Sequence, residues 1–111
     1  MDEQQFRRVV GTALRNLAQQ VDRIDSDDFD AKLAEGVFQV EFEGGGVFVL
    51  SQQVPVSELW LSAYSRAWHF RWAEGSWHER DSGEPLEQVL TTIFSKRMGV
   101  PIPVVNPGPP A

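Results

Sequence analysis

Acidic side chains are crowded into one short segment near the start of the chain. Residues 22–30, DRIDSDDFD, hold five aspartates against one arginine. Carboxylate oxygens are ligands for hard metal cations, so this segment has the donors for a metal site. Aspartate also favours helix ends and turns, so the same run fits a solvated loop that ends a helix. Composition alone leaves both interpretations open.

A tryptophan stands among polar neighbours in the segment VPVSELWLSAYSRAWHF, residues 54–70. Strand alternation puts Leu59 and Leu61 inside and turns Glu58, Trp60 and Ser62 toward solvent. An exposed aromatic ring within a hydrogen-bonding surround is typical of a protein-binding surface. The alternatives are that a loop or the C-terminal tail covers Trp60, or that the alternation is shifted by one residue.

The elements that must position these residues follow from hydrophobic periodicity. An apolar stripe with helical spacing predicts a first helix that frays near residues 25–26, before an aspartate-rich loop. Alternating patterns then predict five strands, at residues 37–43, 47–53, 58–62, 68–72 and 74–80. A second helix follows the turn DSGE, with Asp81 or Ser82 available as its N-cap, and ends near residues 96–99.

This order predicts an α+β fold, a two-layer sandwich with two helices packed on one face of a five- to six-stranded antiparallel sheet. Residues 1–99 form the predicted domain, and residues 100–111 form a Pro-rich C-terminal tail. We expect Val100, Ile102 and Val104 to pack across the helices. We expect the end of the tail to be disordered, and deletion of residues 106–111 to change nothing measurable.

The chain has 111 residues, no cysteine and a formal net charge of −6. A negative surface repels phosphate backbones, so nucleic acid is not an expected partner. No apolar run approaches the ~20 residues of a membrane span, and we expect a soluble, cytoplasmic protein. No serine has a histidine and an aspartate at an informative spacing, so we do not expect a dedicated enzyme.

One long segment, GVFQVEFEGGGVFVLSQQVPVSELWLSAYSRAWHF (residues 36–70), resembles the frataxin family in its short bacterial form. The most specific part is Gln53-x-Pro55-x-x-x-x-Trp60-Leu61-Ser62. The DSGE turn before an apolar helix supports the likeness, which covers roughly residues 6–99. The family fold has the same order of helix, strands and helix as the periodicity predicts.

The resemblance implies weak binding of Fe²⁺ and Fe³⁺ on an acidic ridge formed by the first helix and first strand. Carried over by position, the implied ligands are Asp22, Asp25, Asp27, Asp28 and Asp30. Exposed carboxylates form no preorganised cage, so Mn, Co or Ca ions are expected to compete. The family's ridge is thinner in this chain, because Gln19, Gln20 and Arg23 stand at positions where bacterial relatives are usually acidic.

The resemblance also implies docking on the cysteine desulfurase of iron–sulfur cluster assembly, at or near its scaffold protein, and modulation of that machinery. The implied state is a monomer with possible metal-dependent oligomers. The residues expected to contact the partner lie on the solvent face of the sheet, and they are Ser51, Gln53, Glu58, Trp60, His69 and Arg71. Glu58 stands where the family commonly has glutamine. A lone exposed histidine such as His69 is also compatible with a simple solvated side chain.

An alternative hypothesis is a small acidic secretion-type chaperone or a protein-binding adaptor with no metal role. Such a chaperone would be an obligate dimer with an apolar interface and no dependence on metal. The Gln53, Pro55 and Trp60 signature argues against it.

Overall fold

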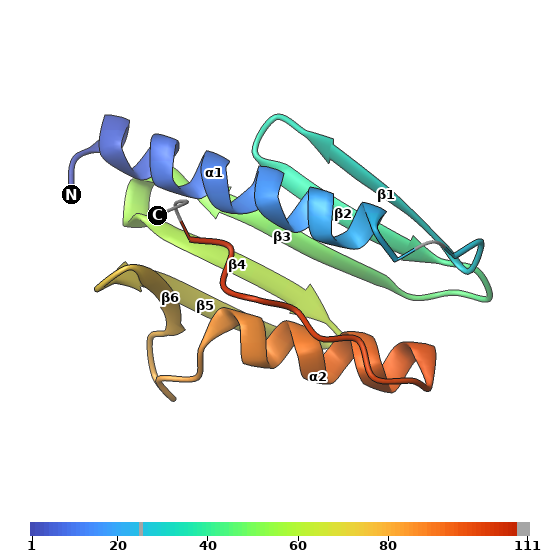
Figure 1. Ribbon diagram of the computed structural model, residues 1–111. Helices are drawn as coiled ribbons and strands as arrows, with labels where there is room; N and C mark the ends of the chain where they lie inside the picture. The colour runs from blue at the N-terminus through green and yellow to red at the C-terminus, as the bar shows by residue number, and fades with distance from the viewer. Residues whose placement is uncertain (25, 109–111) are drawn as a thin grey trace.

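The computed structural model describes residues 1–24 and 26–108 and contains two helices that cover one face of a six-stranded sheet (Figure 1). In chain order the elements are α1 (Glu3–Asp22), β1 (Phe29–Ala34), β2 (Val37–Phe42), β3 (Val47–Gln53), the 3₁₀ turn η1 (Val54–Val56), β4 (Glu58–Ala63), β5 (Arg66–Ala73), β6 (Ser76–Glu79) and α2 (Leu86–Met98). The predicted two-layer α+β sandwich is therefore confirmed. Neither α1 nor α2 is long and apolar enough to cross a membrane.

The strands lie in the sheet in the order of the sequence, β1-β2-β3-β4-β5-β6, and every neighbouring pair is antiparallel. The register places Ser51 opposite Trp60, and Trp60 opposite His69. Gln53 lies opposite Glu58, two residues further along β3. Residues from three neighbouring strands thus share the face of the sheet that the helices leave open.

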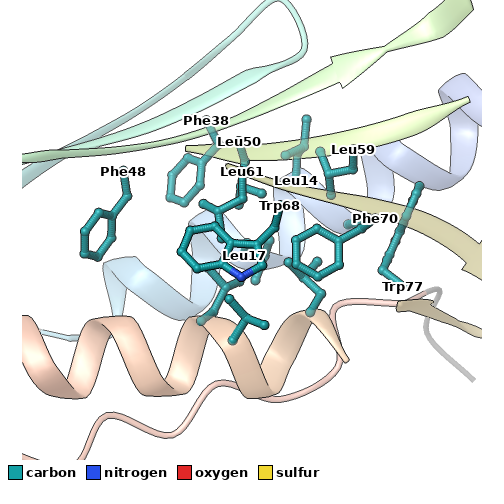
Figure 2. Close-up of a cluster of buried hydrophobic side chains, with 14 of the residues drawn as sticks. Leu14, Leu17, Phe38, Phe48, Leu50, Leu59, Leu61, Trp68, Phe70 and Trp77 are labelled. Atoms are coloured by element: carbon teal, nitrogen blue, oxygen red, sulfur yellow. The ribbon is translucent and has the colours of Figure 1, made fainter. Parts of the chain in front are cut away.

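The core fills the space between the sheet and the two helices. Figure 2 shows Leu14 and Leu17 of α1 facing Phe38, Leu50, Leu61, Trp68 and Phe70 of the sheet. Phe70 and Trp77 are both 0% exposed. Burial of side chains of this size contributes about 1.5–3 kcal/mol each, so this layer is the main stabilising feature of the fold.

The predicted aspartate-rich loop is shorter than expected, because its last residues belong to an additional edge strand. β1 pairs with β2 from Phe29 opposite Phe42 to Ala34 opposite Val37. A two-residue turn joins the strands, with Glu35 at φ 51° and Gly36 at φ 77°. Such a turn with two positive φ values matches the twist of a hairpin. Asp30 therefore lies on a strand.

The start of α2 also differs from the prediction. Pro85 is the N-cap and makes no side-chain capping bond. Asp81 and Ser82 instead donate their backbone N–H groups to the buried carboxylate of Glu79, at 2.8 and 3.0 Å. The predicted helix end is confirmed, because Gly99 closes α2 in the left-handed conformation at φ 74°.

The tail is packed further along its length than expected, and it runs between the two helices (Figure 1). Ile102 and Val104 pack against the core, whereas Val100 is exposed. Beyond them, Asn106 donates to the Gly75 carbonyl at 3.1 Å, and Pro107 is fully buried. Residues 106–108 are therefore packed against the body of the protein, and residues 109–111, the end of the tail, lie outside the described residues.

Candidate functional site

The predicted partner-contact residues do meet on the open face of the sheet, and we call this group, Ser51, Gln53, Glu58, Trp60, His69 and Arg71, the Trp60 surface. Trp60 is 36% exposed, which confirms that its ring points away from the core. The C-terminal tail does not cover it, because the tail packs on α1 and α2 on the opposite side of the sheet.

The Trp60 ring is held on two sides. Its indole Nε1–H donates to Glu58 Oε1 at 2.8 Å. The ring forms a T-shaped pair with the imidazole of His69, with ring centroids 4.8 Å apart and an interplanar angle of 82°. Aromatic pairs of this geometry contribute about 0.5–1.5 kcal/mol beyond the buried area. The ring is therefore presented to solvent in a fixed position.

Glu58 is the part of the prediction that the structure corrects, because this side chain is 1% exposed and not a solvent-facing residue. Its Oε2 accepts from Arg71 Nε at 2.9 Å, and both of its oxygens accept from Arg80 Nη1, at 3.2 and 3.4 Å. The two arginine side chains and the Trp60 ring cover it. A buried carboxylate is tolerated only when charged donors satisfy it, as they do here.

The pKa of Glu58 reflects this environment. Burial raises the pKa, but the hydrogen bonds from Trp60 and Arg71, together with the charge and hydrogen bonds of Arg80, outweigh burial and hold the pKa of Glu58 below its ordinary value. Glu58 is therefore a carboxylate at neutral pH. One negative charge sits beneath two guanidinium groups.

Ser51 and Gln53 complete the Trp60 surface on β3. Both are half-buried, and the Gln53 amide donates to Ser51 Oγ at 3.1 Å. They provide a short polar border beside Trp60. Polar groups that surround an aromatic anchor are the usual composition of the edge of a protein interface.

Arg80 and Glu79 also belong to this region, although neither is among the residues predicted from the sequence. Glu79 is 8% exposed and its Oε2 accepts from the backbone N–H of His69 at 3.0 Å. Burial raises the pKa of Glu79, while the backbone donors of His69, Ser82 and Asp81 outweigh it and lower the pKa. Glu79 thereby fixes the turn that carries Arg80 toward Glu58. The one sequence signal for a buried Glu79 is the strand alternation along residues 76–80, which places it on the same face as Trp77.

The predicted metal ligands lie along one edge of the molecule, and we call Asp22, Asp27, Asp28 and Asp30 the aspartate edge. Asp22 ends α1, Asp27 and Asp28 lie in the connecting turn, and Asp30 lies on β1. Asp25, the fifth predicted ligand, lies outside the described residues. Side chains of the aspartate edge are exposed, as expected of residues at a helix end and an edge strand.

Two hollows border the aspartate edge. One, with a volume of about 440 Å³, is lined by Asp27 and Asp30 together with Glu41 and Glu43. The other, of about 570 Å³, lies between α1 and β1 and includes Asp22 and Asp30. Glu41 enters the first hollow because the register places it opposite Asp30. Within residues 1–24 and 26–108, no three acidic, histidine or cysteine side chains converge closely enough to hold one metal ion.

The family of the chain is established by a match of residues 1–100 to the model of the frataxin-like domain. The chain belongs to the frataxin family. The iron–sulfur cluster assembly protein CyaY of Pseudomonas aeruginosa is 40% identical over 104 residues, covering 89% of this chain and 93% of the relative. CyaY of Photobacterium profundum is 32% identical over 99 residues, with 89% and 93% covered.

Solved frataxin structures share the fold. Frataxin from Psychromonas ingrahamii superposes with a TM-score of 0.87 at 17% identity, covering 96% of this chain and 100% of that one. Trimeric yeast frataxin complexed with ferrous iron superposes with a TM-score of 0.65 at 25% identity, covering 79% and 86%. The frataxin fold thus presents the Trp60 surface on the open face of the sheet and the aspartate edge at the end of α1 and on β1.

Proposed function

We propose that this frataxin-family chain modulates iron–sulfur cluster assembly by docking on the cysteine desulfurase and its scaffold protein. The Trp60 surface is the docking surface of this proposal, and the aspartate edge binds Fe²⁺ and Fe³⁺ weakly. Relatives at 40% and 32% identity carry the name iron–sulfur cluster assembly protein, which supports the process. In this proposal the chain acts as a monomer that can form oligomers in the presence of metal.

The observation that carries the docking proposal is the fixed, 36% exposed ring of Trp60 on an open sheet face. A large ring that is already held in place loses little conformational entropy when a partner covers it. Tryptophan is among the residues most often found at the energetic centre of an interface. Its surround of Ser51, Gln53 and Arg71 supplies hydrogen bonds to the partner backbone or side chains.

The docking proposal is tested with Trp60→Ala. We expect the dissociation constant for the desulfurase to rise by a factor of about thirty or more, as for the loss of an interface hot spot. The fold should persist, because Trp60 is outside the core, and the melting temperature should fall only by the loss of the Glu58 hydrogen bond and the His69 ring contact. The matched control is Val56→Ala, which also removes an exposed apolar side chain. Tyr64→Ala is unsuitable because Tyr64 packs on Phe48. Equal binding by Trp60→Ala and Val56→Ala would refute the docking role.

The iron proposal rests on the donor chemistry of the aspartate edge. Iron in both oxidation states accepts carboxylate oxygens and water as ligands, so the residues fit the ion. Their exposure supports weak binding with several retained waters, because no closed cage replaces the hydration shell. The 440 Å³ hollow brings the carboxylates of Asp27 and Asp30 to the same side as those of Glu41 and Glu43.

Calorimetric titration with Fe²⁺ under anaerobic conditions tests the iron proposal. The variant Asp27→Asn/Asp30→Asn should lose most of the binding heat. The matched control Glu35→Gln/Glu74→Gln removes two exposed charges from turns outside the 440 Å³ hollow. It should keep the full binding heat. Undiminished heat in the aspartate variant, or an equal loss in the control, would show that the hollow is not the site.

A further inference from the structure

Glu58 has a role that differs from that of its neighbours on the Trp60 surface. With 1% of its side chain exposed, it has almost no area to offer a partner. Its two oxygens are instead shared among three side chains, the Trp60 indole, Arg71 and Arg80. Trp60 and Arg71 contact Glu58 directly, and His69 contacts the Trp60 ring.

The geometry around Glu58 leaves one guanidinium partly free. Arg71 uses its Nε–H for Glu58, and its side chain is 63% exposed. Its two terminal nitrogens have no hydrogen-bond partner among the described residues. Arg80, by contrast, uses Nη1 for Glu58 and Nε for Asp81, and its side chain is 36% exposed. Arg71 is therefore the more exposed of the two cations, with both terminal nitrogens available to a ligand beside the Trp60 ring.

We propose that Glu58 is a positioning residue that fixes the Trp60 indole and the Arg71 guanidinium as a two-point anchor for a partner segment with an apolar side chain next to a carboxylate. This inference rests on the proposed docking function and names the chemistry of the partner. The apolar side chain packs against the exposed part of the Trp60 ring. The carboxylate accepts from the terminal nitrogens of Arg71, a pairing that favours a planar, two-bond geometry.

Charge complementarity selects this partner chemistry over a cationic one. Glu58 and Glu79 keep their carboxylates buried, and Asp81 is paired with Arg80. The exposed guanidinium of Arg71 is therefore the charge presented beside the Trp60 ring. The carboxylates of the aspartate edge are on β1 and the adjoining turn, three strands away from β4. A partner carboxylate is therefore attracted by Arg71 locally.

The first experiment tests positioning in the isolated protein, without any partner. Glu58→Gln keeps the shape of the side chain and an oxygen for the indole but removes the charge that holds both arginines. Relative to wild type, we expect the NMR cross-peak of the Trp60 indole N–H to shift and its exchange with solvent to accelerate about three- to tenfold. The Arg71 Nε–H cross-peak should broaden. Glu74→Gln, an exposed carboxylate in the turn between β5 and β6, is the matched control.

The second experiment measures binding to the purified desulfurase, alone and with its scaffold protein. We expect Glu58→Gln to weaken binding about tenfold, because a released anchor must be ordered again on binding. Arg71→Lys keeps the charge but cannot donate to Glu58 and to a partner carboxylate in one plane, so it should weaken binding to a similar extent. Glu74→Gln should bind as wild type does.

The outcomes separate the two proposals. Unchanged indole and Arg71 signals in Glu58→Gln would overturn the positioning role whatever the partner does. Altered signals with wild-type affinity, while Trp60→Ala binds weakly, would show that the anchor is not needed for docking. Failure of the wild-type chain to bind either the desulfurase or its scaffold would overturn the proposed docking function and the partner half of this inference, and the NMR result would still decide positioning.

Discussion

Removal of residues 104–111 should destabilise the protein, although its described part, residues 104–108, has no regular secondary structure. Val104 exchanges two hydrogen bonds with the Thr91 hydroxyl of α2, at 2.9 and 3.3 Å. Val105 exchanges two with the Gln20 side chain of α1, both at 3.0 Å. The segment is thus bonded to both helices, and its loss removes a direct link between them.

The expected magnitude follows from these contacts. Five side-chain hydrogen bonds, including that of Asn106, each contribute about 1 kcal/mol net. Burial of Pro107 and partial burial of Val104 add about 3 kcal/mol together. Ordering five residues costs about 5 kcal/mol, which leaves about 3 kcal/mol of net stabilisation. For a chain of this size we expect the melting temperature to fall by about 10 °C.

The assay is urea denaturation of the full-length and truncated chains, each with and without Gln20→Ala. In the full-length chain Gln20→Ala should cost about 1–2 kcal/mol, because the Val105 backbone loses both partners. In the truncated chain the same substitution should cost nearly nothing, since Val105 is already absent. An equal cost in both backgrounds, or a truncated chain as stable as the full-length one, would refute the reasoning.

Two further predictions concern other parts of the molecule. The folded pKa of Glu58 lies below its ordinary value of 4.5, so the Glu58 carboxylate stabilises the fold fully above pH 4.5. This stabilisation is lost as the pH falls through the folded pKa. Thermal denaturation from pH 6 to 3 should therefore show a shallower loss of stability in Glu58→Gln than in wild type. Arg97→Ala should destabilise the protein by about 1–2 kcal/mol and loosen the turn between β2 and β3, because Arg97 donates to the carbonyls of Glu43 and Gly45 and lies over the Phe42 ring. Amide hydrogen exchange in residues 43–46 checks this second prediction, and unchanged protection there would contradict it.

The helices and five of the six strands could be predicted because their buried positions repeat with a clear period. β1 could not, because five of its six residues are exposed and it gains its place only by pairing with β2. Alternation predicted that Trp60 points outward, and the structure confirms it. It could not predict that Glu58 is buried, because burial depends on Arg71 and Arg80, which lie 13 and 22 residues further along the chain.

The arrangement of the aspartate edge also could not be predicted from the sequence. The sequence indicates that Asp22, Asp27, Asp28 and Asp30 are near one another along the chain, but their arrangement depends on where α1 ends and β1 begins. The register of β1 and β2 places Glu41 opposite Asp30, and no local sequence pattern predicts this pairing. The family resemblance identified the fold and the Trp60 surface, while the side chains that hold Trp60 became apparent only in three dimensions.

Uneven charge along the sheet gives the molecule an electric dipole. Carboxylates gather around β1 and β2, whereas arginines offset part of the acidic charge beside β5 and β6. In solution such a dipole turns an approaching macromolecule before any contact forms, and its influence extends about one Debye length, roughly 8–10 Å at physiological salt. Added salt would then slow the encounter and leave the lifetime of a formed complex nearly unchanged.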